Sequence, residues 1–168
     1  MPRSFDLSVE SPVSVEQVHS AFGDADYWLA RLASYSAGAA TLDSLTTDAD
    51  GTVTVATTVS LFRDGLPRLI TQLHGGDIKT VLNETWSSIG GGRVRGEVSV
   101  AVPGVPLSGF FAGLLTPARN GSRLKYTATV EVEVPLVGGV IESFIGGQLA
   151  EPIAAIQRFT TAWIMEHA

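Results

Sequence analysis

The sequence predicts a single α+β domain, residues 1–168, in which a curved antiparallel sheet wraps around a long C-terminal helix. Two observations predict this class. Between residues 39 and 134, apolar and polar residues alternate with the period of two that is typical of half-buried strands. Between residues 140 and 164, apolar residues recur every three or four positions, as on the buried face of a helix. A run of about six to seven strands before such a helix favours a sheet covered by it on one face.

The C-terminal helix is expected to be long but interrupted. Its apolar stripe comprises Ile141, Phe144, Ile145, Leu149, Ile153, Ile156, Phe159, Trp163 and Ile164, and the other side mostly carries Glu142, Glu151, Gln157, Arg158 and Glu166. If continuous, the helix would be roughly 37 Å long. Gly146, Gly147 and Pro152 disfavour a helix interior, so we expect a bend or break there, with Pro152 near the start of a second helix. The alternative is that the paired glycines let a ligand or a backbone approach closely.

Short elements precede the main run of strands. Alternation from Phe5 to Val9 indicates a first strand, which Pro12 ends. Ser14, with Gln17 three residues later, has the pattern of a capping box at a helix start. A second short helix is expected over residues 26–34, and the large residues on it are Tyr27, Trp28, Leu29 and Leu32.

The remaining strands are expected over residues 41–47, 53–61, 78–86, 93–102, 107–115 and 123–134. Turn residues separate them at 48–51, at 90–92 and at Asn120-Gly121, a strong hairpin signal. A long connection over 63–76 is expected to hold a short helix at 68–73. Segment 107–115 is apolar on both faces, so it is either a fully buried strand or a mobile apolar segment.

Composition narrows the choice of partners. A net charge of −6 disfavours nucleic acid and anionic membranes, because both attract Lys and Arg. Hydrophobic residues make up 45% and charged residues 17%, which indicates a large interior or exposed apolar surface. The absence of cysteine excludes disulfides and thiolate chemistry. No apolar run reaches the roughly 20 residues of a membrane span, and the start lacks a charged-then-apolar leader, so we expect a cytoplasmic protein without a transmembrane segment.

Several stretches together resemble the START-like superfamily, which includes the birch-pollen-allergen-like proteins and polyketide cyclases. They are FDLSVE, SVEQVHSAFGD, DADG, NETW, NGSRLKYTATVEVEVP and QLAEPIAAIQRFTTAWI. The resemblance covers essentially the whole chain and is closest to an actinobacterial family of uncharacterised proteins. It implies a helix-grip fold with a deep apolar cavity between sheet and helix, used across the superfamily for lipids, sterols, polyketides or hormones. One fold hosts many functions, so the resemblance does not name a ligand.

Glu84 is the most informative polar residue. By alternation it shares a strand face with Leu82 and Trp86, which places a carboxylate among apolar side chains. Such a group could act as an acid or could anchor a ligand hydroxyl or amine. The alternatives are a bulge or edge position that turns Glu84 outward, or a salt bridge to an arginine.

The expected cavity lining comes from the inward faces of the strands and the C-terminal helix. It consists of Glu84, Trp86, Val98, Phe111, Tyr126, Phe144 and Trp163. If the aromatic members pack together, they are ordinary core. If the sheet curves away from the helix, they line a pocket, with the Tyr126 hydroxyl and Glu84 as its few polar groups.

No metal, cofactor or covalent nucleophile is expected. His19, His74 and His167 lie far apart in the sequence, and a zinc or iron centre needs three or more ligands. The chain contains no Gly-x-Ser-x-Gly elbow, and its glycine strings lack the Gly-Lys-Ser/Thr ending of a phosphate loop.

Three functions fit these observations. The leading hypothesis is the binding, for transport or sequestration, of a small hydrophobic molecule such as a lipid or a polyketide-like compound. The second is an enzyme of cyclase or aromatase type, with Glu84 and Tyr126 as acid and base. The third is a protein-interaction module without a small ligand, in which Pro106 to Leu115 forms a partner or homodimer surface.

Overall fold

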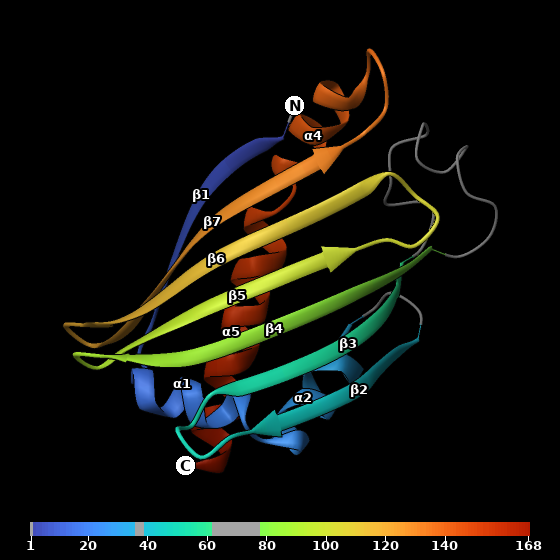
Figure 1. Cartoon of the computed structure of the whole chain (residues 1–168). Helices are drawn as coiled ribbons and strands as arrows, with labels where there is room; N and C mark the ends of the chain where they lie inside the picture. Colours follow the sequence, from blue (N-terminus) through green and yellow to red (C-terminus); the bar gives the residue numbers. More distant parts are fainter. Residues whose placement is uncertain (1, 36–38, 62–77) are drawn as a thin grey trace.

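The described part of the chain forms one curved antiparallel sheet with helices on its concave side (Figure 1). The computed structural model describes residues 2–35, 39–61 and 78–168. In chain order, its elements are β1 (Arg3–Ser11), α1 (Val15–Phe22), α2 (Ala25–Ala33), β2 (Ala40–Thr47), β3 (Val53–Leu61), β4 (Ile78–Gly90), β5 (Arg93–Ala101), β6 (Leu107–Ala118), β7 (Gly121–Val132), α4 (Gly138–Gly146) and α5 (Ala150–His167). The predicted fold class is confirmed.

Strands β2 to β7 form an antiparallel meander, and β1 pairs with β7 as the edge strand on that side. The order of the sheet is β1-β7-β6-β5-β4-β3-β2, and each neighbouring pair is antiparallel. α5 runs across the concave face beside β1, and its C-terminal half meets α1 and α2 (Figure 1). The long helix is therefore held between the sheet and the two short helices.

Helix caps fix the two short helices where the sequence predicts them. The Ser14 side chain accepts from the Gln17 amide at 3.1 Å, and the Ser14 amide donates to the Gln17 side chain at 2.9 Å. Asp24 caps α2 by accepting from the Asp26 amide at 2.8 Å. The indole of Trp28 donates to the Phe22 carbonyl at 2.7 Å, which fixes α2 against α1.

The C-terminal helix is broken, as its glycines and proline predict. α4 ends at Gly146, and α5 begins at Ala150, with Pro152 in its first turn. A Cβ on Gly146 would lie 1.9 Å from a ring carbon of Phe5, so the glycine permits α4 to rest on β1. Gln157 is buried on α5, which corrects its predicted place on the polar side.

The turns form as expected, and the structure fits neither of the two readings of segment 107–115. Gly90, Gly91 and Gly92 all have positive φ between β4 and β5. The β6–β7 hairpin turns at Asn120-Gly121. β6 is a strand whose side chains alternate, with Phe110 exposed and Phe111 inward, so it is neither buried on both faces nor irregular. The short helix expected at 68–73 lies outside the described residues.

Buried side chains form two clusters along the concave face. The larger joins α1 and α2 to the sheet around Trp86, and the smaller packs α4 against β7 around Val130 and Ile141. On the strands between the two clusters, Leu82, Val100 and Phe111 are only partly buried. The centre of the concave face therefore keeps accessible apolar surface.

Candidate functional site

A carboxylate lies in the middle of the concave face. Glu84 on β4 is 4% exposed, and its cross-strand neighbours are Val55 on β3 and Val98 on β5. Phe111 follows Val98 in the same row. The sheet pleat thus places Glu84 inward, as strand alternation predicts, and the outward alternative is wrong.

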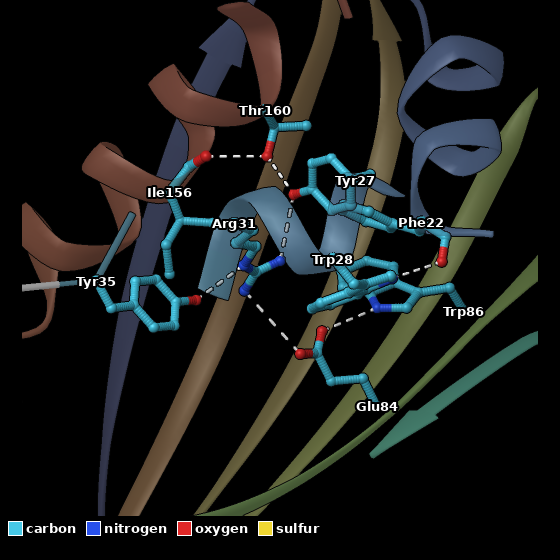
Figure 2. Close-up of polar contacts among 9 residues, drawn as sticks. All are labelled: Phe22, Tyr27, Trp28, Arg31, Tyr35, Glu84, Trp86, Ile156 and Thr160. Carbon is cyan, nitrogen blue, oxygen red and sulfur yellow. Dashed lines mark hydrogen bonds and ion pairs between the residues drawn. The ribbon is translucent and has the colours of Figure 1, made fainter. Parts of the chain in front are cut away.

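Helix α2 brings a guanidinium to this carboxylate. Arg31 is buried on the inner side of α2, and its Nη2 lies 4.0 Å from Oε2 of Glu84 (Figure 2). This separation gives a strong Coulomb attraction but is too long for a hydrogen bond. The Arg31 guanidinium also lies 4.5 Å from the ring centroid of Trp28, within cation–π range. Glu84 therefore faces inward and also forms an ion pair with an arginine, two arrangements that the sequence leaves as alternatives.

A directed hydrogen-bond chain connects Arg31 to α5 (Figure 2). The Thr160 hydroxyl donates to the Ile156 carbonyl at 2.9 Å, so its oxygen accepts from Tyr27 at 2.6 Å. The Tyr27 hydroxyl in turn accepts from Nη1 of Arg31 at 3.4 Å, while Nε of Arg31 donates to Tyr35 at 2.9 Å. These bonds hold the guanidinium in one orientation between helix and sheet.

Two polar atoms of this cluster face each other without a direct hydrogen bond. Oε1 of Glu84 accepts from the Trp86 indole at 3.1 Å. Among the described residues, Oε2 of Glu84 and Nη2 of Arg31 have no hydrogen-bond partner. An oxygen placed about 2.8 Å from both atoms would see them at an angle of about 90°, which hydrogen bonds to one oxygen allow. The pair is therefore spaced to hold one bridging oxygen atom.

Two glycines let aromatic rings lie across the sheet beside Glu84. A Cβ on Gly96 would lie 2.3 Å from the Trp86 ring, and one on Gly113 would lie 2.8 Å from the Tyr126 ring. Gly96 and Gly113 are opposite each other, between Trp86 on β4 and Tyr126 on β7. The Trp86 and Tyr126 rings are 6.4 Å apart, and Phe111 lies 5.8 Å from Tyr126, both nearly edge to face.

The tyrosines of the site are neutral at physiological pH. Burial raises the pKa of Tyr126, and the nearby Glu84 charge raises it further, against the lowering effect of Arg31. Burial also raises the pKa of Tyr27, although Arg31 and the Thr160 hydrogen bond oppose the shift. Both hydroxyls therefore keep their protons and serve as hydrogen-bond donors and acceptors.

The structure brings together most of the expected lining residues. Glu84, Trp86, Val98, Phe111 and Tyr126 all lie on the concave face. Trp163 lies farther along α5, where its ring is 5.3 Å from Tyr27 and stacks on His167.

Phe144 does not belong to this group. Its side chain is 50% exposed on α4, which corrects its predicted inward position. The reason is the break after Gly146, because α4 packs independently of α5 and buries Ile141 and Glu142 instead.

Sequence reasoning missed Arg31, Tyr27 and Thr160 as polar members of the site. Tyr27 and Arg31 are four residues apart and hence on one side of α2. That spacing was the available signal. Of the large residues on this helix, Tyr27, Trp28 and Leu32 are buried and Leu29 is exposed.

Other types of site find little support. No group of three potential metal-ligating side chains occurs within the ranges that the structure describes. His167 stacks on Trp163 near the chain end, and His74 lies outside these ranges. None of the described helices is both long and apolar enough to cross a membrane.

The sheet wrapped around α5 is a helix-grip fold, and solved structures share it. Norcoclaurine synthase from Thalictrum flavum, solved with dopamine and hydroxybenzaldehyde, is 13% identical with a TM-score of 0.56, covering 100% of this chain and 89% of that one. The di-domain ARO/CYC StfQ from the steffimycin biosynthetic pathway is 12% identical with a TM-score of 0.59, covering 99% and 52%. At these identities the likeness shows the fold alone.

The chain belongs to the family described as "Protein of unknown function (DUF2505)", whose model matches residues 6–164. An uncharacterized protein of Mycobacterium tuberculosis strain H37Rv is 39% identical over 170 residues, which are 98% of each chain. The resemblance to an actinobacterial family of uncharacterised proteins is thereby confirmed, and the solved structures share the helix-grip fold that the resemblance implied.

Proposed function

We propose that this protein binds a small, mostly apolar molecule between the sheet and α5, with a polar group of the molecule held by Arg31 and Glu84. The observation that carries the proposal is the spacing of this buried pair. Its two facing atoms are 4.0 Å apart, too far for a hydrogen bond, although both groups are removed from bulk water. Burying charged groups is costly unless they are paired and hydrogen-bonded, so a bridging oxygen stabilises this arrangement.

The pair favours a particular kind of polar group. A hydroxyl accepts from Arg31 and donates to Glu84 at the same time. A carboxylate would be repelled by Glu84, and an ammonium by Arg31. The site therefore selects a neutral hydroxyl over a charged group.

The surroundings of the pair suit an apolar or aromatic body. Phe111, Tyr126, Leu82 and Val100 are only partly buried on the concave face that carries Glu84, whereas Trp86 is fully buried and fixes the carboxylate through its indole. Apolar walls with a few convergent polar groups are the usual composition of small-molecule sites. Hydroxylated lipids and polyketide-like phenols match this chemistry. A synthase that shares the fold was solved with dopamine and hydroxybenzaldehyde, two hydroxylated aromatic molecules, which supports a ligand of this class.

Two measurements test the proposal. Native mass spectrometry of the protein as purified, followed by extraction, would identify any molecule that it retains. Thermal unfolding is then followed with matched probes: naphthol, naphthoic acid and naphthalene, and dodecanol, dodecanoic acid and dodecane. We expect the hydroxylated member of at least one series to raise Tm most. No retained molecule together with no Tm shift for any probe would contradict the proposal.

A second candidate is a cyclase-type enzyme, and one observation favours it. Glu84 and Tyr126 lie on the same face of the sheet in neighbouring rows, and the Glu84 charge is near enough to raise the pKa of the Tyr126 phenol. The raised pKa keeps Tyr126 protonated at neutral pH, so its hydroxyl can hydrogen-bond to a substrate oxygen but cannot be the base expected from the sequence. Incubation with polyketide-like substrates tests this candidate: Tyr126→Phe should abolish turnover while retaining binding. Retained turnover in that variant would argue against it.

A further inference from the structure

Helix α4 has the reverse of the usual amphipathic pattern. Between Glu133 and Glu151, the sequence contains a single charged residue, Glu142. Glu142 is fully buried, and its Oε2 accepts from the Val132 amide at 2.9 Å. Gly138 and Gly146, four residues to either side, are buried with it. The only charge of the segment thus faces the protein.

The opposite side of α4 is apolar and exposed. Leu136 is 103% exposed, Val140 71% and Phe144 50%. Val140 and Phe144 are four residues apart on one side of α4, and the exposed Leu136 lies in the turn just before the helix, so we refer to the three side chains as one stripe. Leu136 also has a φ of 71°, a left-handed conformation that a leucine rarely adopts, and this conformation holds its side chain in solvent.

The size and charge of this stripe identify what it fits. Three side chains present an apolar patch of a few hundred Å² at most, whereas a stable protein interface needs about 800 Å² on each partner. The stripe itself includes no charged side chain, and a charged group beside α4 is the Arg3 guanidinium, 3.5 Å from where a Cβ on Gly139 would lie. An apolar stripe of this kind matches the boundary between headgroups and acyl chains of a bilayer, where a short helix lies in the plane.

We propose that α4 docks the protein onto a zwitterionic lipid surface, with Leu136, Val140 and Phe144 inserted at the level of the headgroups. The net charge of −6 disfavours anionic lipid, so the contact is apolar rather than electrostatic. α4 lies at the end of the molecule where α5 begins, away from α1, α2 and the C-terminus (Figure 1). Docking there leaves α1, α2 and the C-terminus on the side away from the membrane.

The test is flotation of the full chain with phosphatidylcholine vesicles. The test variant combines Leu136→Asn, Val140→Ser and Phe144→Ser, and its fold is checked by circular dichroism and Tm. Leu29→Ser on α2 is the matched control, because that leucine is 54% exposed at the other end of the molecule. We expect the wild type and the control to float with the vesicles, and the triple variant to lose about tenfold or more in partitioning. Added salt should change neither result.

Three outcomes would overturn the proposal. The first is equal flotation of the wild type and the triple variant. The second is binding only to vesicles with anionic lipid and its loss at high salt, which would indicate electrostatic docking. The third is no vesicle binding but a dimer that the triple variant abolishes, which would make a second copy the occupant of the stripe.

The docking proposal is independent of the interior site. Glu84→Gln should leave flotation unchanged, and the triple variant should leave the Tm shift caused by soluble probes unchanged. Failure of one proposal is therefore distinguishable from failure of the other.

Discussion

The substitution Glu84→Gln probes the buried pair most selectively. Glutamine has nearly the same shape and keeps an amide oxygen that accepts from the Trp86 indole, now at 3.1 Å. The oxygen that faces Arg31 is replaced by an amide NH2 group, so the negative charge and the acceptor on that side are both lost. Any change in stability therefore reports on the charge pair rather than on packing.

The magnitude follows from the geometry. At 4.0 Å, two unit charges attract by about 4 kcal/mol at an effective dielectric constant of about 20. Part of this attraction is offset, because the variant no longer buries a carboxylate. We expect a net loss of about 1–3 kcal/mol in the free energy of unfolding, which corresponds to a fall in Tm of about 2–12 °C for a domain of this size.

Thermal and urea unfolding of ligand-free protein measure the effect. The matched control is Glu97→Gln on β5, which removes the same charge from an exposed pair with Arg95 at 3.4 Å. Exposed pairs contribute little, so the control should change the free energy of unfolding by less than about 0.5 kcal/mol. A Glu84→Gln variant as stable as the wild type, or more stable, would refute the claim that the pair holds the interior together.

Two further predictions concern the aromatic floor of the site and its tyrosines. Gly96→Ala should destabilise the fold by about 1–3 kcal/mol and alter tryptophan fluorescence, because its methyl group would overlap the Trp86 ring. The control Gly109→Ala should be tolerated, because its Cβ would have only ordinary contacts. Equal Tm values for the two variants would argue against the close contact between Gly96 and Trp86. Above pH 10, Tyr27 and Tyr126 lose their protons in the unfolded chain but keep them in the folded chain, because burial raises both pKa values. The free energy of unfolding should therefore not depend on these tyrosines below pH 10. Above that pH it should fall by up to about 1.4 kcal/mol per pH unit for each tyrosine. In urea unfolding at high pH, Tyr126→Phe should make this decline shallower, and an unchanged slope would show that Tyr126 is not buried.

The fold could be predicted from the sequence because its signals are local. Strand alternation, the Ser14 and Gln17 capping box, and the glycine turns each act within a few residues, and the structure retains all of them. The same alternation places Glu84 inward correctly, since a strand in a sheet with one buried face admits only that register.

The partners of Glu84 could not be predicted in the same way. Arg31 is far from Glu84 in the sequence, and only the docking of α2 against the sheet brings the two together. The orientation of α4 was unpredictable for a related reason. Its apolar residues suggest that their side of α4 is buried. The side that is buried is instead the one with Gly138 and Gly146, because these glycines leave no Cβ between α4 and Val132 or Phe5. Glu142 lies on the same side as the two glycines and therefore faces inward.

The central claim is that a ligand oxygen bridges Arg31 and Glu84, and calorimetric titration of naphthol and naphthoate into the wild type and Glu84→Gln tests it most directly. The wild type should prefer naphthol by about tenfold or more, because the carboxylate of naphthoate is repelled by Glu84. In the variant this repulsion is gone and Arg31 attracts the carboxylate, so the preference should shrink or reverse. An identical preference in both proteins would show that the ligand's polar group does not contact the pair, and would contradict the account.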